Sequence, residues 1–311
     1  MLELVGVSRS FGSVKALDEV SFEVLPGRLT GFVGANGAGK TTAMRIVMGV
    51  LSADAGAVVW DGAPATRALA AGFGYMPEER GLYPKMPLRP QLVFFAQLHG
   101  LPTEKAEANA DGLLERLGLA GRAKDPVEKL SLGNQQRAQI AAALVHDPAA
   151  LILDEPFSGL DPMAVDVVMG VLRDFAERGA PILFSSHQLD VVERITDDLV
   201  VISAGRVRAS GATAALREAH AGSRHRLVLP PMDDASWLRA VPGVTQAQVR
   251  PAAEAMPGGA GGEAGARTEA TFDAAADVSQ KVLALALARG PVFAFERVVP
   301  SLSDVFKEVA A

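Results

Sequence analysis

Short runs of apolar residues separated by turn residues open the chain, and this pattern predicts β-strands. Three such runs lie at residues 2–7, 20–27 and 29–34, and the third leads directly into a glycine-rich loop. Apolar residues then recur at helical spacing over residues 40–51, and residues 57–62 predict a further strand. The pattern therefore predicts a β-rich entry followed by a strand, a loop and a helix.

Farther along the chain, the pattern predicts a helical insertion and then a parallel sheet. We expect the insertion at about residues 88–150, where Gly100 and Gly121 follow two helical stretches as stop signals. Apolar runs then alternate with helical segments, at residues 151–153, 182–184 and 199–202. This alternation is typical of an α/β fold with a parallel sheet and helices on its faces.

The composition changes after about Gly211, so we expect a first domain at residues 1–211 and a small α+β domain at residues 212–311. Residues 254–269 are rich in glycine and alanine without periodicity, which predicts a flexible loop. The strand and helix patterns around this loop follow the order βαββαβ, the ferredoxin-like arrangement. A last helix is predicted to begin at an N-cap, Ser301 or Ser303.

Composition and charge narrow the classes of function. The chain has 311 residues, a formal net charge of −6 and no cysteine. The negative charge gives no general attraction to DNA or RNA, so no nucleic-acid partner is expected. Disulfides and thiolate metal sites are excluded, which fits a cytoplasmic protein. The sequence has no long uninterrupted apolar run and no secretory signal, so neither a membrane span nor export of the chain is expected.

Residues 34–42, GANGAGKTT, match the phosphate-binding pattern G-x-x-x-x-G-K-[ST] between a predicted strand and a predicted helix. The glycines let several backbone N–H groups face a phosphate, and the helix N-terminus adds positive potential. We expect Lys40 to reach the β- and γ-phosphates of a nucleotide, Thr41 to ligate Mg²⁺ and Thr42 to contact the α-phosphate. A glycine turn that merely caps a helix is the alternative, which the lysine and threonine at this spacing disfavour.

Two acidic residues, Asp154 and Glu155, follow the apolar run at residues 151–153. Ligands collect at the carboxyl ends of strands in open α/β sheets, and adjacent residues of a strand point to opposite faces. Asp154 is therefore expected to hold Mg²⁺, and Glu155 is expected to act as the general base for an attacking water. A solvated strand end is the alternative.

A second turn for an anion is predicted at residues 130–137, LSLGNQQR, where Ser131 and Gly133 precede a helix-forming run. Asp161 and His187 follow at the next loop and at the end of the next strand. His187 is expected to bond the γ-phosphate or the attacking water, with a structural or surface role as the alternative. One nucleotide site does not by itself explain a second anion-binding turn.

These motifs, in this order, resemble the nucleotide-binding subunit of ATP-binding cassette (ABC) transporters over residues 2–211. The phosphate loop is followed by LSLGNQQR as the signature motif, LILDEP as Walker B, SGLDP as the D-loop and SSH as the switch histidine. The resemblance implies a P-loop NTPase of ABC type, with a β-rich subdomain, a parallel core sheet and a helical insertion. It also implies that ATP is bound by Phe11, Gly34, Asn36, Gly37, Gly39, Lys40, Thr41, Thr42, Ser131, Gly133 and Asp161.

Phe11 matches the aromatic residue that stacks on adenine in that family, although a core position is its alternative. In the family, two nucleotide-binding domains pack head to tail. The resemblance therefore implies that Ser131 and Gly133 contact the γ-phosphate of the ATP bound to the partner, most simply in a homodimer. ATP with Mg²⁺ would close this dimer, and hydrolysis would open it.

Two positions depart from the family pattern. Leu132 stands where many members have glycine, and its side chain is expected to point away from the phosphate. Glu78 stands where the family usually has a glutamine that senses Mg²⁺ and the attacking water. A carboxylate still ligates Mg²⁺, so Glu78 is expected in the catalytic and metal site, but it donates no hydrogen bond and adds negative charge.

The leading expectation is an ATPase subunit that powers export through a separate integral membrane permease, on the inner face of the cell membrane. The PEERGLYP loop and the C-terminal extension resemble ATPases of bacterial sodium and drug exporters. A soluble ABC-type ATPase that regulates a non-transport assembly is the first alternative, which the single cassette and the lack of heptads disfavour. A phosphate-binding protein without turnover is the second alternative, and it stays open because Glu78 replaces the usual glutamine.

Two further expectations concern partners. The resemblance places the permease in a groove, and the candidate lining residues are Leu82, Tyr83, Met86, Phe94 and Phe95. The small domain is expected to dimerise or to regulate opening, because a βαββαβ unit exposes a sheet face that needs cover. The transported substrate is not determined by this chain, because its path lies in another.

Overall fold

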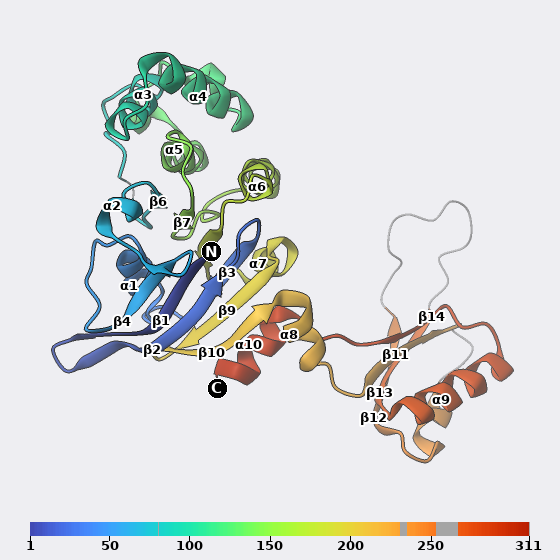
Figure 1. The fold of residues 1–311 in the computed structure, drawn as a ribbon. Helices are drawn as coiled ribbons and strands as arrows, with labels where there is room; N and C mark the ends of the chain where they lie inside the picture. Colours follow the sequence, from blue (N-terminus) through green and yellow to red (C-terminus); the bar gives the residue numbers. More distant parts are fainter. Residues whose placement is uncertain (80, 231–234, 253–266, 311) are drawn as a thin grey trace. The chain divides into compact units, whose positions relative to one another are not determined.

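The computed structural model describes residues 1–79, 81–230, 235–252 and 267–310, and the chain divides into two compact units (Figure 1). The first unit consists of Met1–Leu216 and Leu302–Ala311, and the second consists of Arg217–Ser301. In the chain, the second unit is therefore an insertion in the first. Among the described residues, no helix is long and apolar enough to cross a membrane.

The predicted β-rich entry is an antiparallel sheet with the strand order β2-β1-β4-β5. Its strands are β1 (Leu2–Phe11), β2 (Val14–Val24), β4 (Ala55–Trp60) and β5 (Ala63–Pro64). Alternating residues of β1 and β2, such as Leu2, Leu4 and Phe22, are buried in one cluster with residues of helix α1 (Lys40–Val47). The alternation seen in the sequence is thus the inner face of this sheet.

The predicted parallel sheet is confirmed, in the strand order β10-β9-β3-β8-β7-β6. Parallel pairing joins β3 (Leu29–Val33), β6 (Gly74–Met76), β7 (Leu151–Leu153), β8 (Ile182–Ser186) and β9 (Asp198–Ser203). The edge strand β10 (Arg206–Ala212) is antiparallel to β9. Successive residues of β7 belong to two different core clusters, so both faces of the sheet are covered, which explains the continuous apolar runs.

Three helices, α3 (Leu88–Leu98), α4 (Thr103–Arg116) and α5 (Leu132–Leu144), lie within the range predicted for the helical insertion. The stop after the second helix differs from the prediction, because α4 is followed by Gly118 in the left-handed region, φ +68°, whereas Gly121 lies in a 3-10 turn. The other helical elements of the first unit are α2 (Arg67–Ala70), η1 (Ala120–Arg122), η2 (Val127–Lys129), α6 (Pro162–Glu177), α7 (Leu189–Ile195) and α10 (Leu302–Ala310). Helix α8 (Thr213–Ala219) begins in the first unit and ends in the second.

The second unit has the predicted element order. It contains β11 (Arg224–Leu229), η3 (Ser236–Ala240), β12 (Thr245–Ala252), β13 (Arg267–Asp273), α9 (Ala276–Arg289) and β14 (Ala294–Arg297). Its strands form an antiparallel sheet in the order β12-β13-β11-β14, and the first helix is only a 3-10 turn. Leu227, Phe272 and Val282 are fully buried in the core of this unit.

Two details of the second unit correct the sequence analysis. Residues 254–266 of the predicted loop lie outside the described residues. The last three residues of the predicted loop, 267–269, belong to β13, in which Thr268 is buried, as is Ala270. The other face of the sheet is polar, since it carries Arg226 in ion pairs with Glu269 and Glu296. A polar, ion-paired face does not need the apolar cover that was expected.

The boundary between the units also differs from the predicted one. The change in composition predicts a second domain over all of residues 212–311, whereas the structure groups the start of α8 and all of α10 with the first unit. Leu302 and Val305 of α10 are fully buried, and α10 packs on α7 and β9. α10 begins at Leu302. The residue before it is Ser301, one of the two serines predicted as its N-cap.

Candidate functional site

The predicted phosphate loop connects β3 to α1 at the carboxyl edge of the core sheet, where β7 and β8 also end. Two of its glycines are required by close packing. A Cβ on Gly34 would lie 2.5 Å from the carbonyl oxygen of Ile202, and one on Gly39, with φ +111°, would lie 2.6 Å from that of Ala16. A side chain at either position would therefore displace the loop from the backbone against which it packs.

Lys40, the first residue of α1, is buried and bends back over the loop. Its Nζ donates to the carbonyl oxygens of Gly34, at 2.7 Å, and Ala35, at 3.3 Å. In the part of the chain that the structure describes, Lys40 forms no ion pair. A buried ammonium group without a counter-ion fits a site for an anionic ligand, because an unpaired buried charge is costly.

Asp154 joins three elements at this edge. Thr41 Oγ1 of α1 donates to Asp154 Oδ2 at 2.8 Å, and Ser185 Oγ of β8 donates to Asp154 Oδ1 at 2.5 Å. Asp154 is 1% exposed. The hydroxyl and the carboxylate are hard oxygen donors of the kind Mg²⁺ prefers. Among the described residues, no group of three or more acidic or histidine side chains suited to a metal is present.

Glu155 and His187 form the second contact of the site. Glu155 has a left-handed backbone, φ +53°, and its N–H donates to Ser185 Oγ at 2.8 Å. His187 Nδ1 lies 2.9 Å from Glu155 Oε2, and the His187 side chain is 57% exposed. A non-glycine residue with this backbone is strained, and such strain is concentrated at functional sites. The carboxylate is thus within hydrogen-bonding distance of the histidine.

The N-terminus of α5 lies at the surface. Ser131 is its N-cap, and Ser131 Oγ accepts from the N–H of Asn134 at 3.4 Å, as expected of a serine before a helix. The Leu132 side chain is 61% exposed, and Gly133 lies close to the loop before α6, since a Cβ on it would be 3.6 Å from the carbonyl oxygen of Gly159. Neither Ser131 nor Gly133 contacts the phosphate loop of its own chain in any described hydrogen bond.

Two buried glutamines of α5, which the sequence analysis missed, fasten the site. Gln136 Nε2 donates to the carbonyl oxygens of Glu155, at 2.9 Å, and Pro156, at 3.1 Å. Gln139 Nε2 donates to those of Pro77, at 2.9 Å, and Glu79, at 3.0 Å. In the sequence NQQRAQ, Gln136 and Gln139 are spaced by about one helical turn, and this spacing predicts that both side chains lie on the same face of the helix. Ser185 was also missed as a site residue, although it is the first residue of the SSH motif.

The remaining predicted residues are not joined to this network. Phe11 ends β1, is 48% exposed and lies under the Arg9 guanidinium, so it is not a core aromatic. Glu78 is exposed in the loop after β6, and Asp161 accepts from the N–H of Ala164 at 2.8 Å as the N-cap of α6. Asn36 and Gly37 are exposed in the phosphate loop, and Thr42 is half-buried in α1.

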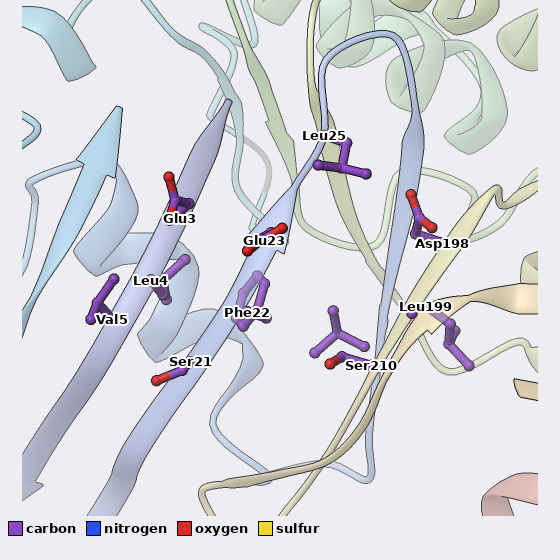
Figure 2. A pocket seen from close by; sticks show the side chains of 12 residues that line it. Glu3, Leu4, Val5, Ser21, Phe22, Glu23, Leu25, Asp198, Leu199 and Ser210 are labelled. Carbon is purple, nitrogen blue, oxygen red and sulfur yellow. The ribbon is translucent and has the colours of Figure 1, made fainter. Parts of the chain in front are cut away.

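A pocket of about 490 Å³ lies elsewhere in the first unit, between β1 and β2 on one side and β9 and β10 on the other (Figure 2). Glu3 and Glu23 line it together with the apolar side chains of Phe22 and Leu199. Asp198, also at this pocket, is already paired with Arg28. None of the predicted site residues lines it, so the candidate nucleotide site is formed by the phosphate loop and not by this pocket.

Comparison with known families agrees with the motifs. The model of the ABC transporter family matches residues 17–158, and that of the C-terminal domain of DrrA1-3-like ATP-binding proteins matches residues 211–310. The chain is 34% identical over 308 residues to the ABC transporter ATP-binding protein YhaQ of Bacillus subtilis, which covers 99% of this chain and 98% of that protein.

Two further similarities concern the first unit. The chain is 38% identical over 218 residues to the Nod factor export ATP-binding protein I of Paraburkholderia xenovorans, covering 69% of this chain and 72% of that protein. A solved ATP-binding subunit of an ABC transporter is 31% identical and superposes with a TM-score of 0.65, covering 70% of this chain and 92% of that one. The chain therefore belongs to the family of ABC transporter ATP-binding proteins and is an ATPase of that family.

Proposed function

We propose that the chain is the ATP-hydrolysing subunit of an export-type ABC transporter, in which two copies close around two ATP molecules and drive a separate membrane permease. The observation that carries the proposal is the contact between Glu155 and His187 beside the Thr41–Asp154 pair, at the mouth of the phosphate loop. The names of relatives, among them Nod factor export ATP-binding proteins, support the direction of transport.

The residues of the phosphate loop are proposed to hold ATP. Lys40 already has its ammonium group directed at the loop carbonyls and would move the short distance to the β- and γ-phosphates. Thr41 and Asp154 would hold Mg²⁺, which neutralises charge on the phosphate oxygens when bound. Gly34, Asn36, Gly37, Gly39 and Thr42 would supply backbone and hydroxyl donors to the phosphates, and Phe11, exposed at the end of β1, would stack on the adenine.

Glu155 is proposed as the general base. Its backbone is fixed by Ser185 and by Gln136, so the carboxylate is aimed without help from the ligand. A base fixed in this way accepts a proton from a water that attacks the γ-phosphate in line. His187, which contacts the same carboxylate, is placed to bond the γ-phosphate or this water. Glu78 would approach Mg²⁺ from the loop that Gln139 holds.

The N-terminus of α5 is proposed to serve the ATP of the partner copy. Ser131 and Gly133 lie at the start of a helix of 13 residues, whose N–H groups and dipole favour an anion. Their exposure at the surface is what a contact with a second chain requires. Asp161, which caps α6 next to Gly159, would lie at the same interface.

The permease is proposed to dock on the helical insertion. Tyr83, 55% exposed, stacks near Phe95 with ring centroids 6.1 Å apart, and Phe94 is partly exposed beside them. A pocket of about 230 Å³ adjoins this aromatic group and is lined by Leu82, Pro84 and Gln139, among others. Docking here would place the chain on the inner face of the cell membrane and connect the permease to the Glu78 loop through Gln139.

The substitution Glu155→Gln tests the function. It keeps the shape of the side chain but removes the base, so ATP binding should be retained while phosphate release falls by about 10²–10⁴-fold. The variant should then accumulate as an ATP-bound dimer, measured by light scattering and by retained labelled nucleotide. Glu177→Gln, an exposed residue at the end of α6, is the matched control. Undiminished phosphate release by Glu155→Gln, or no dimer with ATP, would show the proposal to be wrong.

A further inference from the structure

The position of His187 depends on the short helix that follows it. β8 ends at Ser186, and α7 begins at Leu189. Since the His187 side chain is more than half exposed, few packing contacts hold it, and the backbone between β8 and α7 decides where its ring lies. α7 has seven residues, and a helix of that length is not stable without tertiary contacts.

Two neighbours hold α7. At its C-terminal end, Arg173 of α6 donates to the carbonyl oxygen of Ile195 at 2.8 Å. On its inner side, Val192 and Ile195 are buried in the same cluster as Leu302, the first residue of α10. α10 lies beside β9 and β10 in the first unit and packs on α7 (Figure 1).

A polar contact joins α7 to α10. The N–H of Leu302 donates to Glu193 Oε2 at 2.7 Å. The first N–H groups of a helix have no acceptor within the helix, so this carboxylate satisfies one of them and lies at the positive end of the α10 dipole. Because Leu302 is fully buried, α10 cannot shift without breaking this contact or exposing its apolar face.

We propose that Glu193 is a positioning residue for ATP hydrolysis, which holds α7 on the N-terminus of α10 and thereby keeps His187 beside Glu155, a role that rests on the function proposed above for His187. Glu193 lies on α7, outside the phosphate loop, and acts through the backbone of α7. Leu302 directly follows Ser301, the last residue of the second unit. The second unit is thus joined through the chain to Leu302, the residue that Glu193 contacts.

The test measures single-turnover ATP hydrolysis and nucleotide affinity in the full chain. Glu193→Ala should lower the hydrolysis rate about tenfold without changing nucleotide affinity, because small misplacements of a reacting group cost up to about 100-fold. Glu193→Gln keeps an oxygen acceptor for the Leu302 N–H and should recover most of the rate. Glu193→Gln is also the variant to measure if Glu193→Ala does not fold. Glu308→Ala, which removes an exposed acid from α10 itself, should change nothing.

The double variant separates a positioning role from a general structural one. If Glu193 acts through His187, Glu193→Ala should cause no further loss in a chain that already carries His187→Ala. A wild-type rate for Glu193→Ala, or an equal loss with and without His187, would overturn the role of Glu193. If His187→Ala alone hydrolyses ATP at the wild-type rate, the function proposed for His187 is at fault, and the role of Glu193 is overturned with it.

Discussion

His146 is a buried histidine outside the candidate site. It follows α5, is 9% exposed, and its ring stacks on that of His99 with centroids 3.7 Å apart. Burial, and secondly the neighbouring His99, lower the pKa of His146 to about 4, from an ordinary value of 6.5. The folded protein therefore keeps this ring neutral over a pH range in which the unfolded chain takes up a proton.

The pH dependence of stability should reveal His146. Since the unfolded state binds the extra proton, stability is lost as the pH falls from about 6.5 towards about 4. Between pH 7 and pH 5, this group should cost about 2 kcal/mol in the free energy of unfolding. His146→Phe, which preserves a flat ring without a proton to bind, should lose correspondingly less, as measured by urea unfolding at both pH values. Identical losses in the two proteins would contradict the assignment.

At the scale of elements, α5 joins several parts of the site. Its N-terminus presents Ser131, Gln136 holds the chain after β7, and Gln139 holds the loop after β6. Because all three residues lie on one helix, a movement of α5 is carried to Glu155 and to the Glu78 loop together. This arrangement mechanically links the surface turn to Glu155.

Gln139→Leu should weaken this link. The substitution leaves the carbonyl oxygens of Pro77 and Glu79 without their donor, which costs about 1–3 kcal/mol in stability. We expect slower phosphate release with unchanged nucleotide affinity, because the phosphate loop does not contact Gln139. Gln280→Leu, at an exposed position of α9, is the control and should alter neither property. Equal phosphate release by the two variants would argue against a role of Gln139 in the site.

Two ways of removing the second unit should differ in their effect on stability, because α10 follows this unit in the chain but packs on the first unit. A chain that ends at Gly211 loses Leu302 and Val305, so buried apolar surface on α7 and β9 becomes exposed and the protein should be unstable or aggregate. A chain in which residues 217–301 are replaced by a linker of about eight glycine and serine residues keeps α10. It should remain folded and bind nucleotide, as measured by thermal unfolding and by titration. The reverse order of stability would show that α10 does not belong to the first unit.

At the scale of the whole molecule, the proposed shared site makes a prediction about mixtures. Lys40→Ala damages the phosphate loop and Ser131→Arg blocks the turn for the partner's phosphate, so neither variant should hydrolyse ATP alone. In a mixed dimer, both defects fall in one site and the other site is intact. Random mixing in equal amounts should therefore restore about a quarter of the sites. Single-turnover hydrolysis measures this, and a mixture as inactive as its components would contradict a site shared between chains.

Much of the site could be predicted because its residues are neighbours in the sequence. Lys40 and Thr41 follow the glycines of the loop directly, and Asp154 follows a strand whose apolar run is evident. Ser185, Gln136 and Gln139 were not predicted, because each acts on backbone atoms or on a carboxylate far away in the chain. Such contacts leave no local pattern, and only the packing of α5 against β6 and the pairing of β8 with β7 create them.

The sequence by itself determined the phosphate loop, the parallel sheet and the order of strands and helices in the second unit, since these follow from local spacing and from periodic burial. Only the tertiary structure decided that α10 returns to the first unit, that the open face of the second sheet is polar and that Glu193 meets the N-terminus of α10. These features depend on which surfaces meet after the chain has closed on itself, and the free energy of burying one apolar face against another is not written in any short stretch of residues.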